Sequence, residues 1–167
     1  MNGLLDLTDK IGLASMATLR SVHEIASNLK LPYVIVGATA RDMIMHHGYG
    51  ARIQRATEDI DFGIQVSSWN DFDALNEKLH QNGFNQGMQQ HRFIGPENIP
   101  VDIVPFGDIE SDNSEISWPP DGEYVMSMRG FQEAIENAQQ VLIHKDPEVI
   151  CPEGWSMLKP KYTPTRT

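Results

Sequence analysis

Two aspartates, Asp59 and Asp61, stand in a segment with the alternation of a half-buried β-strand. Along residues 59–66 apolar side chains alternate with polar or small ones, which is the period of a strand with one face in a core. Both aspartates therefore project from the same face, about 6–7 Å apart at Cα for a rise of about 3.3 Å per residue. Two carboxylates at that separation can bind one or two hard cations, as a two-metal phosphoryl-transfer site requires.

Two further segments carry other parts that such a site needs. Asp102 lies in a predicted strand between Val101 and Ile103, on the side opposite to these two apolar residues. It could help to bind a metal or accept the proton of an attacking hydroxyl. Upstream, a short apolar run over residues 33–36 ends at Gly37, and a helical pattern follows at once. A turn that leads into a helix offers free backbone N–H groups to phosphate oxygens.

Each of these residues also has a plain structural interpretation. Asp59 and Asp61 could be two solvated carboxylates on a strand face, and Asp102 could be an ordinary exposed strand residue. Gly37 could serve only tight packing between a strand and a helix. The occurrence of three such segments in order along one chain favours the functional interpretation of Asp59 and Asp61.

The elements that must position these residues follow from periodicity and breakers. Helical spacing predicts helices at residues 13–29, 40–47, 68–81 and 131–138. Strands are predicted at residues 33–36, 59–66, 84–94, 99–104, 123–127 and 141–143, with a flexible acidic loop at 108–123. Residues 155–159 begin like a helix that Pro160 stops. We expect one domain over residues 1–167, of α/β (α+β) class, with a small mixed central sheet flanked by helices.

Composition limits the possible classes of protein. The 167 residues are 40% hydrophobic and 22% charged, which is ordinary for a soluble domain. Thirteen basic and 23 acidic side chains give a net charge of −10, which argues against broad binding to nucleic acid. A single cysteine, Cys151, suits a reducing cytosol, and neither a signal peptide nor a membrane span is evident. We therefore expect a cytoplasmic protein.

Three segments, taken in order, resemble the signature of the DNA polymerase β-like nucleotidyltransferase superfamily. They are Val-Gly-Ala-Thr-Ala-Arg-Asp at residues 36–42, Arg-Ala-Thr-Glu-Asp-Ile-Asp-Phe at 55–62 and Val-Asp-Ile at 101–103. The second segment resembles the abortive-infection toxin-type (AbiEii-like) enzymes, which belong to toxin–antitoxin systems. The first is also similar to tRNA CCA-adding enzymes and poly(A) polymerases. The resemblance covers roughly residues 31–106.

The resemblance implies a nucleotidyltransferase core that moves a nucleoside monophosphate from a nucleoside triphosphate such as ATP to an acceptor hydroxyl. Pyrophosphate leaves, and Mg²⁺ or Mn²⁺ is required. By this resemblance Asp59 and Asp61 bind metal, and Asp102 completes the catalytic and metal site. The nucleotide phosphates would be held by Gly37, Ala38, Thr39, Arg41 and Arg55. The acceptor could be tRNA, a protein or a small molecule. For Arg41 and Arg55, a solvated helix face and a solvated loop are the plain alternatives.

Two features favour other outcomes. The superfamily usually carries Gly-Gly or Gly-Ser where this chain has Gly37-Ala38, which favours a degenerate module that binds nucleotide or a protein without catalysis. The tail at residues 156–167 is expected to be a truncated form of the helical region that follows in related enzymes. The apolar group Trp155, Met157 and Leu158 would then be covered by a second copy, which predicts a possible homodimer. A structural or metal-binding domain without nucleotide is the third alternative.

Overall fold

The computed structural model describes residues 5–52 and 59–143, together with the backbone of residues 156–157. The elements in chain order are β1 (Leu5–Asp6), α1 (Leu13–Asn28), β2 (Tyr33–Val36), α2 (Gly37–Asp42), a π-helix (Met43–Gly48), β3 (Ile60–Val66), α3 (Trp69–Gln81), β4 (Asn85–Gln86), β5 (Arg92–Ile94), β6 (Pro100–Gly107), β7 (Glu115–Ser117), β8 (Val125–Ser127), α4 (Phe131–Glu136), β9 (Gln139–Leu142) and β10 (Ser156–Met157).

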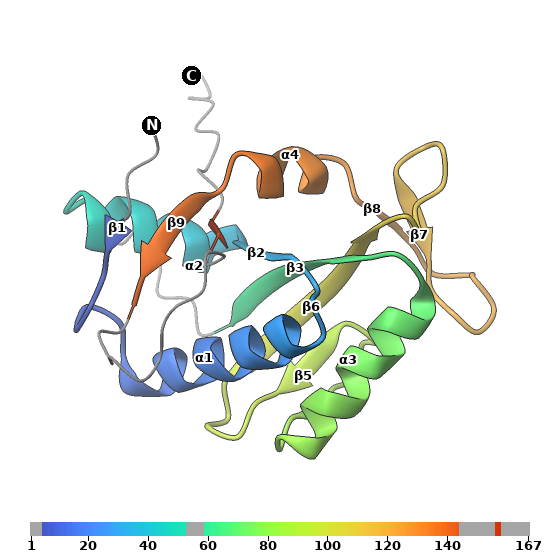
Figure 1. Ribbon diagram of the computed structural model, residues 1–167, viewed down its shortest axis with the longest axis horizontal. Helices are drawn as coiled ribbons and strands as arrows, with labels where there is room; N and C mark the ends of the chain where they lie inside the picture. The colour runs from blue at the N-terminus through green and yellow to red at the C-terminus, as the bar shows by residue number, and fades with distance from the viewer. Residues whose placement is uncertain (1–4, 53–58, 144–155, 158–167) are drawn as a thin grey trace.

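One mixed sheet runs in the order β1-β9-β10-β2-β3-β6-β5-β4, and β7 and β8 form a separate two-stranded sheet. Helices α1 and α3 lie on one side of the mixed sheet and α4 lies on the other (Figure 1). This arrangement confirms the predicted α/β class, with a mixed central sheet between helices.

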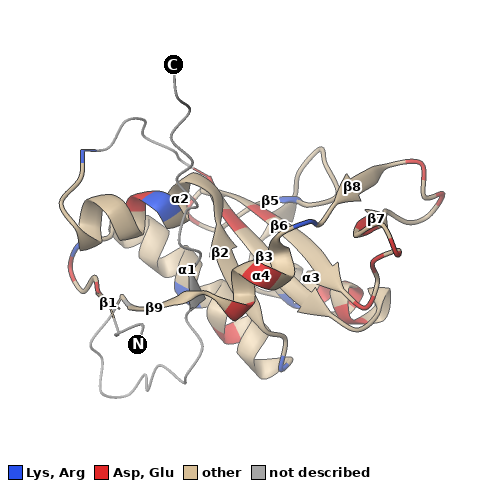
Figure 2. Cartoon of the chain, turned by 90° about the horizontal axis from the view of Figure 1, so that it is seen from above, with Lys and Arg blue, Asp and Glu red and all other residues tan. Residues whose placement is uncertain are grey.

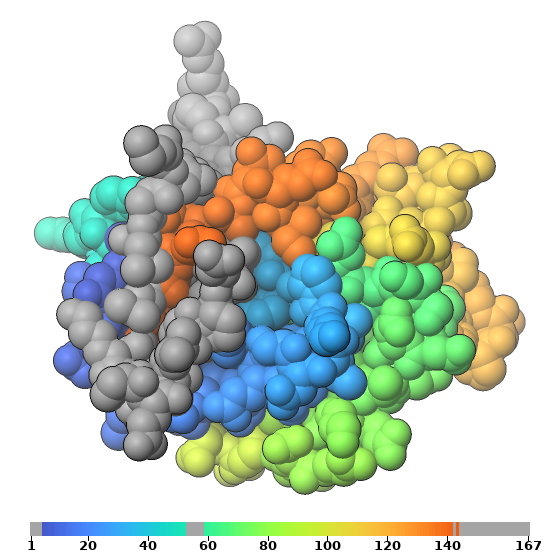
Figure 3. Space-filling view, viewed as in Figure 1, coloured from blue at the N-terminus to red at the C-terminus, as the bar shows by residue number. Residues whose placement is uncertain are grey.

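The core lies between the central strands and the helix pair α1 and α3. Ile60, Phe62 and Ile64 of β3 are almost completely buried, as the alternation predicts for one face of this strand. Figure 3 shows α1 (blue) and α3 (green) packed side by side over this part of the molecule. The opposite face of β3 carries Asp61, which is only partly buried, and Gly63, against which Phe131 of α4 packs.

The predicted helix boundaries hold for α1 and α3. Helix α3 begins where Ser68 accepts a hydrogen bond from the backbone N–H of Asp71, and it ends at Asn82 before Gly83 in the left-handed region. Helix α2 begins at Gly37, three residues before the start of the helix predicted at residues 40–47. It continues as a π-helix from Met43 onward.

The predicted single strand over residues 84–94 is wrong. This run forms two short antiparallel strands, β4 and β5, joined by a reversal. The side-chain amide of Gln86 donates to the carbonyl oxygens of Gln89, Gln90 and Arg92 and so closes the reversal. The irregular alternation of this run reflects a hairpin rather than one strand.

The prediction of a flexible acidic loop at residues 108–123 is also wrong in part. Strand β7 lies within it and pairs with β8, while Trp118 is only 2% exposed. The indole of Trp118 packs against Trp69 and Phe72 of α3. This segment is ordered by long-range apolar contacts that its local composition does not reveal.

The predicted helical start at residues 155–159 is wrong for Ser156 and Met157. These two residues form β10, which pairs with both β2 and β9. Trp155 and Leu158 lie outside the described residues. Within the described ranges, none of the helices has the length and apolar character needed to cross a membrane.

Candidate active site

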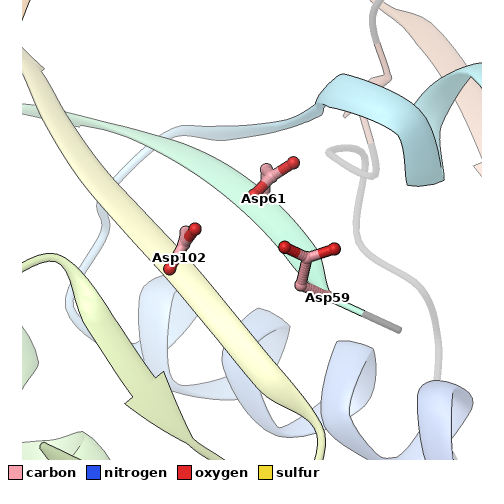
Figure 4. Close-up of side chains that lie close together, drawn as sticks. All are labelled: Asp59, Asp61 and Asp102. Atoms are coloured by element: carbon pink, nitrogen blue, oxygen red, sulfur yellow. The ribbon is translucent and has the colours of Figure 1, made fainter. Parts of the chain in front are cut away.

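Asp61 and Asp102 lie on adjacent strands at the centre of the sheet. Strands β3 and β6 pair in parallel, and their register places Asp61 directly beside Asp102. Asp59 directly precedes β3, two residues before Asp61, and so lies on the same face of the strand. Figure 4 shows the three side chains gathered on one side of the two strands. The structure therefore brings together the three aspartates that the sequence indicated.

The three carboxylates are close enough to share a ligand. One oxygen from each can be chosen so that all three lie within 4.8 Å of one another, and each side chain is partly buried. Carboxylate oxygens are the donors that Mg²⁺ and Mn²⁺ favour in proteins. The donor set therefore fits a hard divalent cation, which would also relieve the repulsion between the three negative charges.

Asp61 carries the electrostatic consequence of this clustering. Burial and the neighbouring charges of Asp59 and Asp102 raise the pKa of Asp61 from 3.8 to about 6, while Arg92 acts in the opposite direction. A carboxyl group with a raised pKa beside two other carboxylates is a common feature of a functional site. A cation bound at Asp61 would favour its ionised form.

Arg92 of β5 joins two of the three carboxylates. Its Nε donates to Oδ1 of Asp102 and its Nη2 donates to Oδ2, both at 2.6 Å. Nη2 also lies 3.3 Å from Oδ2 of Asp59. The hydrogen bonds to Asp102 raise the pKa of Arg92. Arg92 is thus a fixed positive charge within the acidic cluster.

Arg92 was not among the site residues that the sequence indicated. Its position depends on the hairpin that places β5 beside β6, where Arg92 is the register partner of Asp102. A local signal does exist, because Arg92 precedes the buried Phe93 and must therefore face the other side of the sheet. That signal does not identify the neighbouring strand, so the contact could not be predicted.

Gly37 lies against the carboxylate of Asp61, and Thr39 contacts the backbone of Asp59. Gly37 has a φ of +70°, and a Cβ placed on it would lie 2.3 Å from Oδ2 of Asp61. The hydroxyl of Thr39 donates to the backbone carbonyl of Asp59 at 2.7 Å. Ala38 lies between them in the first turn of α2. The predicted phosphate-binding segment is therefore next to the predicted metal site.

Arg41, one of the two predicted phosphate-binding arginines, pairs with Asp42 rather than with the three clustered aspartates among the described residues. Arg41 donates to Oδ1 of Asp42 from Nε at 3.1 Å and from Nη2 at 3.0 Å, and its side chain is 41% exposed. Asp42 therefore orients the Arg41 guanidinium. Arg55 lies outside the described residues.

A separate pocket lies away from the three aspartates. It has a volume of about 440 Å³ and lies between α3, the β4–β5 connection and the turn after β7. Trp69, Phe72 and Trp118 supply its aromatic lining, and none of the three aspartates lines it. The carboxylate cluster, and not this pocket, is therefore the candidate active site.

Several solved structures resemble the chain at low sequence identity. The lincosamide antibiotic adenylyltransferase LnuA, bound to lincomycin, is 19% identical, with a TM-score of 0.44 over 72% of this chain and 69% of that one. ANT(2″)-Ia in complex with adenylyl-2″-tobramycin is 18% identical, with a TM-score of 0.44 over 87% of this chain and 69% of that one. The Thermotoga maritima CCA-adding enzyme complexed with tRNA is 13% identical, with a TM-score of 0.42 over 79% of this chain and 33% of that one.

The sequence also matches a family model over more than half of the chain. No curated protein matches the chain. Residues 22–123 match the family described as nucleotidyl transferase AbiEii toxin of type IV toxin–antitoxin systems. This range contains β2, α2, β3, β5 and β6, and hence all three clustered aspartates, Arg92 and the Gly37 turn. The chain belongs to the AbiEii nucleotidyltransferase toxin family.

Proposed function

We propose that the protein transfers a nucleoside monophosphate from a nucleoside triphosphate to an acceptor hydroxyl and releases pyrophosphate. The observation that carries this proposal is the convergence of Asp59, Asp61 and Asp102 within 4.8 Å beside the Gly37 turn. Membership of the AbiEii family supports nucleotidyl transfer as the class of reaction.

Mg²⁺ or Mn²⁺ would be held by Asp59 and Asp61, with Asp102 as the third carboxylate of the centre. When bound, the ion neutralises negative charge on the triphosphate. In the reaction the acceptor oxygen forms a bond to the α-phosphorus, the bond from that phosphorus to the bridging oxygen breaks, and pyrophosphate leaves with the electron pair. The hydroxyl proton passes to water.

The chain's own residues contribute position and charge. Thr39 tethers the start of α2 to the backbone of Asp59, so the phosphate-binding turn and the first carboxylate keep a fixed separation. Gly37, Ala38 and Thr39 would hold phosphate oxygens, with Arg41 and Arg55 as further cationic partners. Arg92 limits the net negative charge of the cluster, which lowers the electrostatic cost of approach by a triphosphate.

The acceptor is constrained mainly by charge. Figure 2 shows acidic residues on several elements, among them α4 and the region around β7. With a net charge of −10, the surface disfavours extended contact with nucleic acid. A tRNA acceptor would need a local basic contact, whereas a protein or small-molecule hydroxyl would not. ATP is the first triphosphate to test, and the cytoplasm is the proposed site of action.

A degenerate module that binds nucleotide without turnover is the second candidate. The observation that favours it is that two groups at the site are already engaged within the protein. The Thr39 hydroxyl donates to the Asp59 carbonyl, and both oxygens of Asp102 accept hydrogen bonds from Arg92. In such a module these contacts persist when nucleotide binds.

Thermal shift with each nucleoside triphosphate, with and without Mg²⁺ or Mn²⁺, tests both candidates. Ligand at 100 times its Kd stabilises the folded state by about 2.7 kcal/mol. A metal-dependent shift accompanied by pyrophosphate release supports the enzyme, and a shift without release supports the module. The matched controls are Asp61→Asn, which removes a clustered carboxylate, and Asp112→Asn, which removes an exposed carboxylate outside the cluster. The absence of any shift contradicts both candidates.

The possible homodimer also stays a prediction, because Trp155 and Leu158 lie outside the described residues. Light scattering of dilute protein decides between the two states. A species of 18.8 kDa that does not associate contradicts the dimer.

A further inference from the structure

The fork of Arg92 occupies both oxygens of Asp102. One guanidinium nitrogen donates to each oxygen, and both distances are 2.6 Å. Bidentate pairs of this kind are among the stronger charge-assisted contacts in proteins. The Asp102 side chain is 16% exposed, so water competes little for its oxygens. Asp102 is therefore the carboxylate of the cluster whose charge is already matched.

The position of Arg92 is built into the fold. Strands β5 and β6 are antiparallel, and Arg92 is paired in register with Asp102. The backbone N–H of Gly87 donates to the carbonyl of Arg92 at 2.7 Å. A Cβ on Gly87 would lie 2.8 Å from Cγ of Arg92, so glycine at this position leaves room for the arginine stem. The sheet and the β4–β5 hairpin thus hold the side chain over the carboxylates.

The charges within the cluster match one divalent cation. Three ionised aspartates contribute −3 and Arg92 contributes +1, which leaves −2. One Mg²⁺ or Mn²⁺ neutralises this charge, whereas a second would place two divalent ions beside a guanidinium. Like charges held this close repel each other strongly in a partly buried site.

We propose that Arg92 takes the place of a second metal ion at Asp102, so that the centre binds a single divalent cation on Asp59 and Asp61. This inference rests on the proposed function, because it assumes that the cluster binds metal. It assigns Arg92 as a positioning residue that holds Asp102 and fixes the number of ions. It also accounts for the contact of one guanidinium with both Asp102 and Asp59.

Manganese stoichiometry tests the inference without relying on activity. Electron paramagnetic resonance of free Mn²⁺ gives the number of ions bound per chain, first with Mn²⁺ alone and then with α,β-methylene-ATP. Ions that still bind to Asp61→Asn are subtracted as non-specific. We expect the wild-type protein to bind one ion in both conditions. Two ions bound to the wild-type protein would overturn the proposal whether or not any variant folds.

Three arginine variants supply the matched comparison. Arg92→Met removes the charge and should bind two ions, with the first held at least roughly fivefold more tightly because a neighbouring positive charge is gone. Arg92→Lys keeps the charge and should bind one. Arg20→Met removes an exposed arginine paired with Glu24 on α1 and should behave as the wild type. One ion in Arg92→Met with unchanged affinity would overturn the proposal.

The same titration separates this inference from the proposed function. If the wild-type protein binds α,β-methylene-ATP in a metal-dependent way but with two ions, only the role of Arg92 is wrong. If it binds neither Mn²⁺ nor the nucleotide analogue, the proposed function and the single-ion centre both fail.

Discussion

Gly37 and Asp61 lie in direct contact across the pair of strands β2 and β3. The turn at Gly37 follows β2, whose last residue is paired with Asp61, and a Cβ on Gly37 would lie 2.3 Å from a carboxylate oxygen of Asp61. Real Cβ atoms do not approach an oxygen this closely, so a larger residue must displace Asp61 or the turn. The absence of a side chain at Gly37 is therefore a condition for the carboxylate cluster.

Gly37→Ala should lose metal-dependent nucleotide binding. The new Cβ displaces the Asp61 carboxylate, and the φ of +70° adds strain of roughly 1–2 kcal/mol for an L-residue. Gly50→Ala is a close control, because Gly50 has a φ of +73° but nothing within 4 Å of its added Cβ. Both variants should melt earlier, and only Gly37→Ala should lose Mn²⁺ binding. Equal Mn²⁺ affinity in the two variants would contradict the contact.

Asp61→Asn should abolish metal-dependent triphosphate binding while the fold stays intact. Mutation of a residue that hydrogen-bonds to a metal ligand commonly lowers metal affinity by roughly 10–100-fold. Loss of a ligand itself should lower the affinity at least as much. Because Asp61 is repelled by two neighbouring carboxylates, its neutralisation should leave the metal-free protein as stable or slightly more stable. Calorimetric titration with Mg²⁺ and nucleotide measures the first effect, and urea unfolding measures the second. A variant that unfolds, or that binds as the wild type does, refutes the assignment.

The free energy of unfolding of the metal-free protein should depend on pH through Asp61. Burial and the charges of Asp59 and Asp102 raise the pKa of Asp61 to about 6 in the folded state. Between the unfolded pKa of about 3.9 and this value, the folded chain binds more protons than the unfolded chain. Its contribution to stability therefore falls as pH rises towards 6 and levels off above that pH.

Urea unfolding in chelator at pH 5.2 and 7.5 measures this dependence. Only the part of this interval below the folded pKa of about 6 contributes, and each pH unit is worth roughly 1.36 kcal/mol. The contribution of Asp61 to the free energy of unfolding should therefore fall by at most about 1 kcal/mol, since solvent screens the charges around this partly exposed group. The contributions of other carboxylates to the pH dependence of unfolding largely cancel when the wild type is compared with Asp61→Asn. This variant should lack the contribution of Asp61. The idea fails if the difference between the two proteins is independent of pH.

Ser68→Ala should destabilise the protein through the start of α3. The Ser68 hydroxyl oxygen accepts a hydrogen bond from the backbone N–H of Asp71 at 3.4 Å, which is a long N-cap contact. The expected loss is about 0.5–1 kcal/mol, the lower part of the range for a cap of this type. Ser67→Ala changes the adjacent serine, which precedes the cap, and should have a smaller effect in the same urea titration. Equal losses would show that the cap contributes nothing.

The sequence by itself determined the two strands that carry the aspartates, two of the helices and the three aspartates of the site. Alternation in residues 59–66 and around Asp102 depends only on the period of a strand, which is local, so both strands were predicted. The same holds for α1 and α3, because helical spacing involves neighbours only a few residues apart.

Tertiary structure alone decided which strands become neighbours. The pairing of β6 with β3 places Asp102 beside Asp61, and the β4–β5 hairpin brings Arg92 to both Asp102 and Asp59. The same long-range packing orders Trp118 within a segment of acidic, loop-like composition and makes a strand of residues 156–157. Strand partners are chosen by apolar burial and backbone hydrogen bonding between distant segments, and a local period carries no information on that choice. The three aspartates could therefore be predicted from the sequence, whereas the arginine that balances their charge could not.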